Sequence, residues 1–221
     1  MDKPLLTYFP VRGRAELIRL ILAQAGVDYD EHPVMKGTPE KNGRPTDFAA
    51  LKESGHLPFA AVPTWEEPGG FRLAQSAAIA TYLASAHGLR GRDAHEAALC
   101  DQMLGAYEDV RVEARSLVNT AADARAARFQ ELDATVLPRW LGYLERLLAS
   151  HRDGTGWLVG DDVSYADLAL FYIVEVMRDN GFTAPSRYPL ILAHSARVAA
   201  LPRIAAYLAS PRRPAFLPFP R

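Results

Sequence analysis

The chain has 221 residues, 49% of them hydrophobic, which suffices for one large domain or two small domains with buried cores. Its 25 basic and 26 acidic residues leave a formal charge of −1, so no strong overall field attracts nucleic acid or an anionic membrane. A single cysteine, an N-terminus unlike a leader peptide, and no apolar run near the ~20 residues of a spanning helix predict a cytoplasmic protein without disulfides or membrane segments.

The N-terminal stretch predicts a strand, a helix and a second strand. Leu5 to Phe9 is a short apolar run typical of a strand, and apolar residues at helical spacing predict a helix over residues 14–25 that ends at Gly26. Residues 27–34 alternate loosely between polar and apolar, as a second strand does. Such a crossover is right-handed and makes the two strands parallel, so the sequence predicts a βαβ unit.

Tyr8 lies where the first strand gives way to the helix. A strand-to-helix turn leaves the last strand residue beside helix N–H groups that lack partners and attract anions. A phenolic hydroxyl keeps its proton at neutral pH, so Tyr8 is expected to donate a hydrogen bond into this crevice rather than to act as a base. The alternative is an aromatic residue that packs on the sheet and keeps its hydroxyl in water.

The next segments complete a thioredoxin-like order. Residues 35–46 are mostly glycine, proline and polar residues, which predicts a long loop and a possible lid. Residues 61–66 and 70–74 are extended segments joined by a Pro-Gly turn, which predicts a β-hairpin. Gln75-Ser76 then opens a helix with Ile79, Tyr82, Leu83 and Ala86 on one face. We therefore expect an α/β thioredoxin-like domain over residues 1–85.

Helical patterns dominate the rest of the chain. After a linker at residues 86–93, residues 94–221 are predicted to form an all-helical domain, with long helices over 96–121 and 124–150. Their expected apolar faces are formed by Leu99, Met103, Ala106, Val110, Ala114 and Leu117 in the first helix, and by Phe129, Leu132, Val136, Trp140, Tyr143, Leu144 and Leu147 in the second.

Three further features of this half concern its packing, and the arginine pairs of the whole chain concern its surface. Ser164 and Asp167 form a predicted capping box at the start of another helix. Cys100 is expected to be a small core residue rather than a nucleophile. The proline-rich residues 211–220 cannot continue a helix and are predicted to form an extended tail. The arginine pairs at 12/14, 90/92 and 212/213 are interpreted as solvated surface.

Two short segments of the first half suggest peptide binding. A cis bond at Val62-Pro63 would turn the preceding backbone N–H and C=O toward a bound peptide, although a trans bond is the commoner alternative. Gln75-Ser76 offers a hydroxyl, an amide and helix N–H groups to a carboxylate, and a plain N-cap serine is the alternative. The sequence lacks paired metal-binding histidines, nucleophile-elbow motifs and glycine-rich nucleotide motifs, so neither metal nor nucleotide chemistry is expected.

These segments resemble one known family. TYFPVRGRAELIR (residues 7–19), PFAAVP (58–63) and QSAAIATYLA (75–84) are similar to motifs of tyrosine-type cytosolic glutathione S-transferases, with features of the sigma and pi classes. The capping box at Ser164 resembles a motif of the same family. The resemblance implies the glutathione transferase fold, with a thioredoxin-like N-terminal domain and an all-α C-terminal domain. It also implies transfer of glutathione to a small hydrophobic electrophile.

The resemblance assigns roles to individual residues. Tyr8 matches the catalytic tyrosine that activates the glutathione thiol. The residues expected to bind glutathione are Arg14, Phe48, Lys52, Val62, Pro63, Gln75, Ser76 and Asp109. The residues expected to line the hydrophobic-substrate site are Phe9, Val11, Arg115 and Asn119.

Two positions depart from the family pattern. Phe48 stands where sigma-like relatives carry a tryptophan, and it lacks the indole N–H donor. Ala60-Ala61 replaces the usual glycine followed by glutamine or lysine. The loss of two neutral hydrogen bonds is expected to weaken glutathione binding by roughly 1–3 kcal/mol.

The resemblance further implies a homodimer in which Asp109 reaches the γ-glutamyl ammonium bound to the other subunit. Two observations favour this role: no obvious acid lies beside Ser76 in the sequence, and the adjacent Glu108 and Asp109 repel each other unless a cation is near. A solvated helix acid is the alternative. The alternative functions are a non-catalytic binder of glutathione or an apolar ligand, and a glutathione-dependent isomerase or peroxidase.

Overall fold

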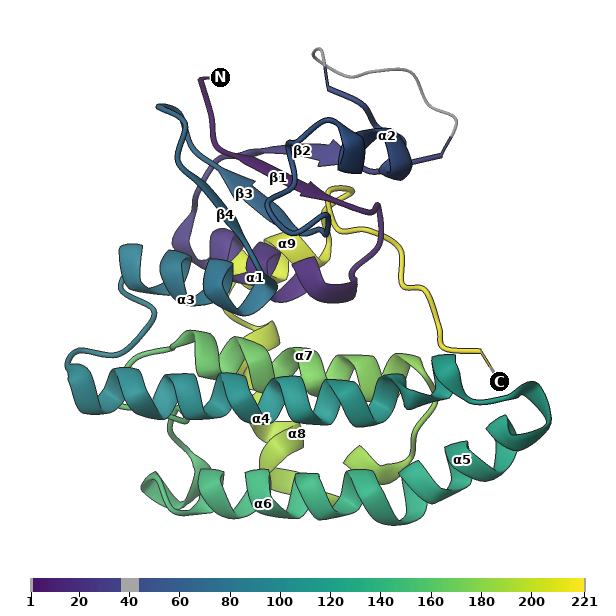
Figure 1. Ribbon diagram of the computed structural model, residues 1–221. Helices are drawn as coiled ribbons and strands as arrows, with labels where there is room; N and C mark the ends of the chain where they lie inside the picture. Colours follow the sequence, from purple (N-terminus) through teal and green to yellow (C-terminus); the bar gives the residue numbers. More distant parts are fainter. Residues whose placement is uncertain (1, 37–43, 221) are drawn as a thin grey trace. The chain divides into compact units, whose positions relative to one another are not determined.

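Residues 2–36 and 44–220 are described by the computed structural model, in which the chain divides into two compact units. The first unit comprises Met1–His87 together with Ala209–Leu217, and the second comprises Gly88–Leu208 together with Pro218–Arg221. The segment that follows the last helix therefore belongs mostly to the N-terminal unit (Figure 1).

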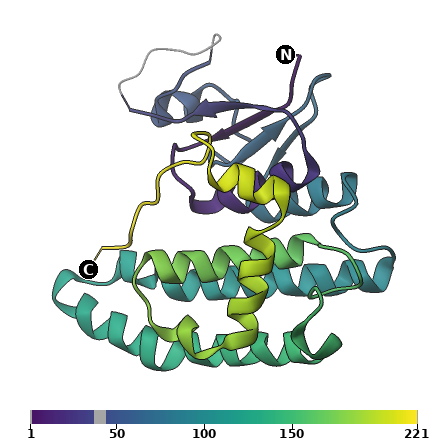
Figure 2. The same ribbon diagram turned by 180° about the vertical axis from the view of Figure 1, so that it is seen from behind.

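The first unit is a four-stranded sheet with helices. Its elements are β1 (Leu5–Tyr8), α1 (Glu16–Ala25), β2 (Asp30–Pro33), α2 (Phe48–Glu53), β3 (Thr64–Glu66), β4 (Arg72–Ala74) and α3 (Ser76–Ala86). The strand order is β2-β1-β3-β4, with β1 parallel to β2 and antiparallel to β3. Helices α1 and α3 pack side by side on one face of the sheet (Figures 1 and 2). This is the thioredoxin-like arrangement predicted from the sequence.

Local signals place the ends of these elements. A single 3-10 turn over Gly13–Ala15 leads into α1, and Gly26 ends the helix in a left-handed conformation with φ of 74°. Strand β3 begins later than predicted, at Thr64, because the preceding Pro63 has no N–H to donate to a ladder. The Glu67 N–H donates to the Phe71 carbonyl at 2.9 Å and closes the predicted hairpin.

The polar loop before α2 is only partly described. The lid predicted over residues 35–46 falls largely on residues 37–43, which lie outside the described ranges. The Met35 N–H donates to the Thr46 carbonyl at 2.9 Å. Asp47 then accepts hydrogen bonds from the N–H groups of Ala49 and Ala50 and so caps α2, a helix that the sequence analysis did not identify.

The second unit is helical, and its described residues contain no strand. Its α-helices are α4 (Ala94–Asn119), α5 (Arg125–Glu131), α6 (Leu137–Ala149), α7 (Tyr165–Asp179), α8 (Pro189–Ala199) and α9 (Pro202–Leu208). Short 3-10 turns lie at Ala122–Ala124, Arg152–Gly154 and Ala184–Arg187. The central helix α7 packs against both α4 and α8. Among the described residues, no helix combines the length and apolarity needed to span a bilayer.

The helix predicted over residues 124–150 is interrupted. A π-helical segment at Leu132–Val136 connects α5 to α6, so the backbone stays helical but changes its hydrogen-bonding pattern. The sequence analysis predicted neither this segment nor helices α8 and α9.

The predicted capping box at α7 is confirmed and extended. The Asp167 carboxylate accepts hydrogen bonds from the Ser164 N–H and hydroxyl at 2.8 and 2.9 Å, and from the Leu158 N–H at 2.8 Å. His194 on α8 contacts the same carboxylate through Nε2 at 2.8 Å. Because Asp167 is fully buried, these bonds join the start of α7 to two other segments of the unit.

Two residues predicted to lie in the core are exposed. The exposed fractions of Leu99 and Tyr143 are 47% and 49%. The buried face of α4 runs through Cys100, Met103 and Tyr107, and that of α6 runs through Leu137, Leu141, Leu144 and Leu148. Adjacent residues on a helix point about 100° apart, so a face displaced by one residue leaves Leu99 in solvent. Cys100 is buried as predicted, and this burial raises the pKa of its thiol to about 11.

Candidate functional site

The turn after β1 places Tyr8 beside the start of the first helix. Tyr8 is 8% exposed, and its hydroxyl oxygen accepts a hydrogen bond from the Arg14 N–H at 2.9 Å. Arg14 lies in the 3-10 turn that leads into α1, so the juxtaposition of the hydroxyl and helix N–H groups predicted from the sequence is present. Because the oxygen accepts this bond, the hydroxyl hydrogen remains available for donation to a second acceptor.

Gly13 allows the Tyr8 hydroxyl to lie close to the backbone of the turn. It has φ of +43°, and a Cβ atom built on it would lie 2.6 Å from the Tyr8 hydroxyl oxygen. No side chain fits at that distance without movement of the tyrosine.

We therefore expect Gly13→Ala to displace the Tyr8 hydroxyl and to lower turnover of the glutathione conjugation that the sequence resemblance implies by roughly tenfold to a hundredfold. Gly55→Ala is the matched control, because Gly55 also has positive φ, +74°, but a Cβ there would have no atom within 4 Å. It incurs the left-handed backbone cost of about 1–2 kcal/mol without the clash. Equal turnover in the two variants would show that the close approach does not matter.

A buried arginine supports the same turn. Arg19 is fully buried, and its guanidinium donates to both carboxylate oxygens of Glu31 at 2.9 and 3.0 Å. It also donates to the Val11 carbonyl at 3.0 Å, and its central carbon lies 5.9 Å from the centroid of the Tyr8 ring. The sequence analysis missed this residue, since an arginine on an amphipathic helix is ordinarily exposed.

The C-terminal tail contributes to this network. Residues 211–220 contain no helix, as predicted, and the Arg213 side chain donates to the fully buried carboxylate of Glu16 at 2.9 Å. Arg12 donates to the Pro214 carbonyl at 3.2 Å, and Arg212 donates to the Tyr29 carbonyl at 2.8 Å. The interpretation of Arg213 as solvated surface is therefore wrong, because its side chain is largely buried against Glu16. Arg212 is exposed as predicted, although it also bonds the first unit.

Five of the predicted glutathione-binding residues lie together around one cavity. This cavity has a volume of about 190 Å³ and is formed entirely by the first unit. It is lined by Arg14, Val62, Pro63, Gln75 and Ser76, and also by Phe59, Ala61 and Ala74. The Val62-Pro63 bond is cis, as predicted. The lining residue Phe59 is strongly exposed, and no sequence signal distinguished it.

The polar end of this cavity suits a carboxylate. Ser76 is the first residue of α3, so backbone N–H groups of the first helical turn open there. Gln75 precedes it with φ of +73°, a conformation that is uncommon outside glycine and concentrates at functional sites. Arg14 donates from its side chain to Ser76 Oγ at 3.3 Å. Arg14 therefore connects the tyrosine to the cavity, because its backbone N–H donates to the Tyr8 hydroxyl and its side chain donates to Ser76.

Phe48 and Lys52 do not line this cavity. Both lie on α2, where the Lys52 ammonium is 4.3 Å from the centroid of the Phe48 ring. The Phe48 ring also packs edge-on against Phe9 at 5.3 Å, beside a buried apolar cluster of Val34, Leu51 and Leu57. The structure therefore groups these two residues with each other and with Phe9.

The remaining predicted residues are divided between the two units. Phe9 and Val11 are half-buried in the first unit, whereas Asp109, Arg115 and Asn119 are exposed on α4 in the second. Asp109 makes no hydrogen bond or ion pair with the rest of the described chain.

The predicted repulsion between Asp109 and Glu108 needs no bound cation. Glu108 is already paired with Arg111 at 2.7 Å, so a positive charge within α4 offsets the two acids. Among residues 2–36 and 44–220, no group of three or more His, Cys, Asp or Glu side chains is placed to hold a metal ion.

Both halves of the chain match models of one protein family. The model described as "Glutathione S-transferase, N-terminal domain" matches residues 4–85, and "Glutathione S-transferase, C-terminal domain" matches residues 108–211. Glutathione S-transferase alpha-2 of Rattus norvegicus is 33% identical, over 96% of this chain and 92% of its own. Glutathione S-transferase P 1 of Xenopus laevis is 32% identical, over 94% of this chain and 92% of its own.

Solved structures agree with the sequence matches. The Pi-class glutathione S-transferase of Onchocerca volvulus has a TM-score of 0.81 and 27% identity, covering 94% of this chain and 92% of its own. The structure named NaGST-2 has a TM-score of 0.80 and 30% identity, covering 96% of this chain and 98% of its own. Two family models that together cover most of the chain, and relatives above 30% identity over nearly its full length, lead to one conclusion: this protein belongs to the glutathione S-transferase family.

Proposed function

We propose that this glutathione transferase activates its co-substrate through a hydrogen bond from Tyr8 to the glutathione sulfur, for attack on a small hydrophobic electrophile. The observation that carries the proposal is the bond from the Arg14 N–H to the Tyr8 hydroxyl oxygen at 2.9 Å. It orients the hydroxyl and leaves its hydrogen for the sulfur. It also makes the hydroxyl a better donor, because a chain of hydrogen bonds polarises each of its members.

The chemical need for this bond follows from the acidity of thiols. A free thiol with a pKa of ~8.5 is only a few per cent thiolate at pH ~7, and the thiolate is the nucleophile. A donor that binds the anion better than the neutral thiol lowers the pKa of the bound thiol, at ~1.4 kcal/mol for each unit.

The cavity beside Ser76 supports a position for the other end of the peptide. We infer that the γ-glutamyl carboxylate binds at the start of α3, where Gln75, Ser76 and Arg14 offer donors. The backbone of Val62, next to Pro63 in the same cavity, would pair with the cysteinyl residue.

The glycyl end is assigned to α2. There the Lys52 ammonium lies over the Phe48 ring, which holds the two side chains together. The Lys52 ammonium would pair with the glycyl carboxylate. Phe48 supplies no hydrogen-bond donor, and Ala61 supplies no polar side chain, so we expect glutathione affinity to be lower than in relatives with polar residues at both positions.

The function is tested by steady-state conjugation of glutathione to a generic aryl halide beside calorimetric titration of glutathione alone. Catalysed conjugation together with saturable binding supports the proposal. Binding without turnover would instead favour a non-catalytic binder of glutathione. Turnover of peroxides or isomerisable substrates but not of aryl halides would assign the same thiolate to another reaction.

We further propose a homodimer in which Asp109 of the partner subunit pairs with the γ-glutamyl ammonium. Asp109 is exposed and has no partner within the described chain, and no carboxylate of residues 2–36 or 44–220 lines the cavity beside Ser76. Phe9 and Val11, together with Arg115 and Asn119, remain the proposed contacts of the hydrophobic substrate.

Asp109→Asn should weaken glutathione binding roughly tenfold to a hundredfold, because a charge-assisted hydrogen bond contributes about 1.5–3 kcal/mol. Calorimetry measures the affinity, and sedimentation should show a dimer at micromolar concentration. Asp123→Asn, at another exposed acid of the second unit, is the matched control and should leave affinity unchanged. Unchanged affinity in Asp109→Asn would leave this residue as an ordinary solvated acid.

A further inference from the structure

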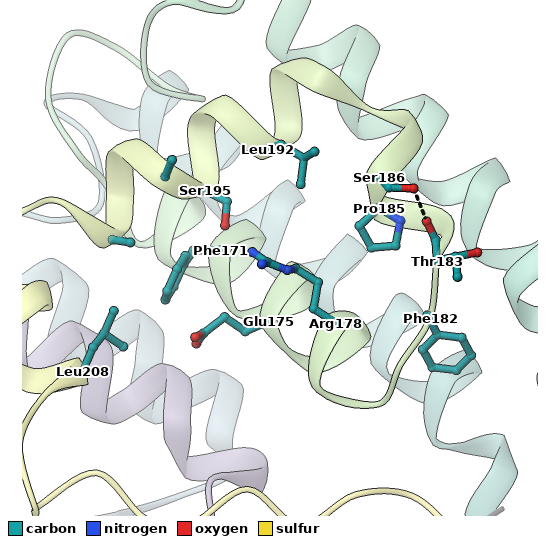
Figure 3. Close-up of a pocket in the computed structure, with 12 residues that line it drawn as sticks. Phe171, Glu175, Arg178, Phe182, Thr183, Pro185, Ser186, Leu192, Ser195 and Leu208 are labelled. Atoms are coloured by element: carbon teal, nitrogen blue, oxygen red, sulfur yellow. Dashed lines mark hydrogen bonds between the residues drawn. The ribbon is translucent and has the colours of Figure 1, made fainter.

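The second unit contains a larger cavity that none of the predicted site residues lines. Its volume is about 730 Å³, within the range of about 300–1,000 Å³ typical of small-molecule pockets. Residues from α7, the 3-10 turn at Ala184–Arg187, α8 and α9 surround it (Figure 3). The full lining is Phe171, Glu175, Arg178, Phe182, Thr183, Pro185, Ser186, Leu192, Ser195, Ala196, Ala199 and Leu208.

Most of this lining is apolar. Phe171 comes from α7, Leu192 from α8 and Leu208 from α9, so apolar side chains approach from three helices (Figure 3). A ligand with a hydrocarbon or aromatic body would bury apolar surface here, at about 25 cal/mol for each Å² removed from water.

Two polar side chains of the cavity have no partner in the described chain. Ser195 is only 5% exposed, yet its hydroxyl makes no hydrogen bond to the residues that the structure describes. The Arg178 side chain likewise makes no hydrogen bond or ion pair there. By contrast, the Thr183 hydroxyl donates to Asp133 at 2.6 Å, and the Ser186 hydroxyl donates to the Thr183 carbonyl at 2.7 Å.

The positive charge of the lining comes from Arg178, whose guanidinium has no partner in the described chain. Glu175 also lines the cavity, but it is already engaged within the protein. In Figure 3 the Arg178 guanidinium points toward Ser195, whereas the Glu175 carboxylate points toward Leu208. Arg178 is exposed and Ser195 is buried, and both line this cavity, so a guanidinium and a hydroxyl without partners in the described chain can both donate to a carboxylate there.

We propose that this cavity binds a small apolar carboxylate, with its anionic head on Arg178 and Ser195 and its apolar body against Phe171, Leu192 and Leu208. This second site goes beyond the glutathione site, since no residue assigned to glutathione or to the electrophile lines it. Its binding does not depend on the Tyr8 chemistry.

Titration calorimetry of the full chain with sodium decanoate tests the proposal. We expect saturable binding with a Kd on the order of 10–100 µM, and binding of uncharged decan-1-ol at least about tenfold weaker. Arg178→Gln should weaken decanoate binding roughly tenfold or more, and Ser195→Ala by a smaller factor. Arg139→Gln removes the same charge from an exposed position on α6 that does not line the cavity, and it should bind decanoate like the original chain.

A second variant locates the bound ligand. Ala196 lines the cavity but is itself exposed, so Ala196→Phe fills the space without crowding the core, and it should abolish binding. Glutathione conjugation should stay unchanged in Arg178→Gln and Ala196→Phe, which separates this site from the proposed active site. No saturable decanoate binding up to about 1 mM, or equal binding by Arg178→Gln and the original chain, would overturn the proposal.

Discussion

Tyr8→Phe is expected to lower turnover of glutathione conjugation by up to about two orders of magnitude, while glutathione affinity changes little. The substitution keeps the buried ring and removes only the hydroxyl, whose oxygen accepts a hydrogen bond from the Arg14 N–H. A donor to a sulfur anion acts mainly when the charge is present, so the loss appears in kcat rather than in binding of the neutral thiol.

The acidity of the bound thiol distinguishes this role from a structural one. Ultraviolet titration of the thiolate should give a lower pKa for glutathione bound to the original protein than for free glutathione, and Tyr8→Phe should return it toward the free value. Tyr82→Phe is the matched control, because the Tyr82 hydroxyl bonds Glu67 and does not line the glutathione cavity. The same thiol pKa in the original protein, the Tyr8→Phe variant and free solution would exclude the proposed activation.

Arg19→Ala is expected to lower the free energy of unfolding by about 3–5 kcal/mol, the range for breaking a buried ion pair by removal of one partner. Arg19 is fully buried, and the substitution removes both of its bonds to Glu31 and its bond to the Val11 carbonyl. Glu16 lies 3.6 Å from Arg19 but keeps its bond to Arg213, which favours the lower part of the range.

Urea denaturation of the two proteins measures this loss. Lys3→Ala provides the contrast, because the Lys3–Asp28 pair at 2.7 Å is also an ion pair of the first unit but both side chains are at least half exposed. Solvent and salt screen such a pair, so we expect its removal to leave stability nearly unchanged. Similar midpoints for Arg19→Ala and the original chain would mean that the network around the Tyr8 turn adds no net stability.

Features coded by neighbouring residues were readable from the sequence. The βαβ unit, the hairpin closed by Glu67 and Phe71, and the capping box of Ser164 and Asp167 all depend on periodicity or on spacings of a few residues. The placement of Tyr8 beside helix N–H groups belongs to the same class, since Arg14 follows it six positions later in the chain.

Features that join distant segments required the tertiary structure. The pairing of Arg213 with Glu16 spans 197 positions, and no local pattern distinguishes these two residues from ordinary surface charges. The exposure of Leu99 depended on which side of α4 meets α7, and the larger cavity depends on how α7, α8 and α9 pack. Local sequence determines where helices and strands form, whereas the partner of each buried charge and the shape of each cavity are set by the packing of segments far apart in the chain.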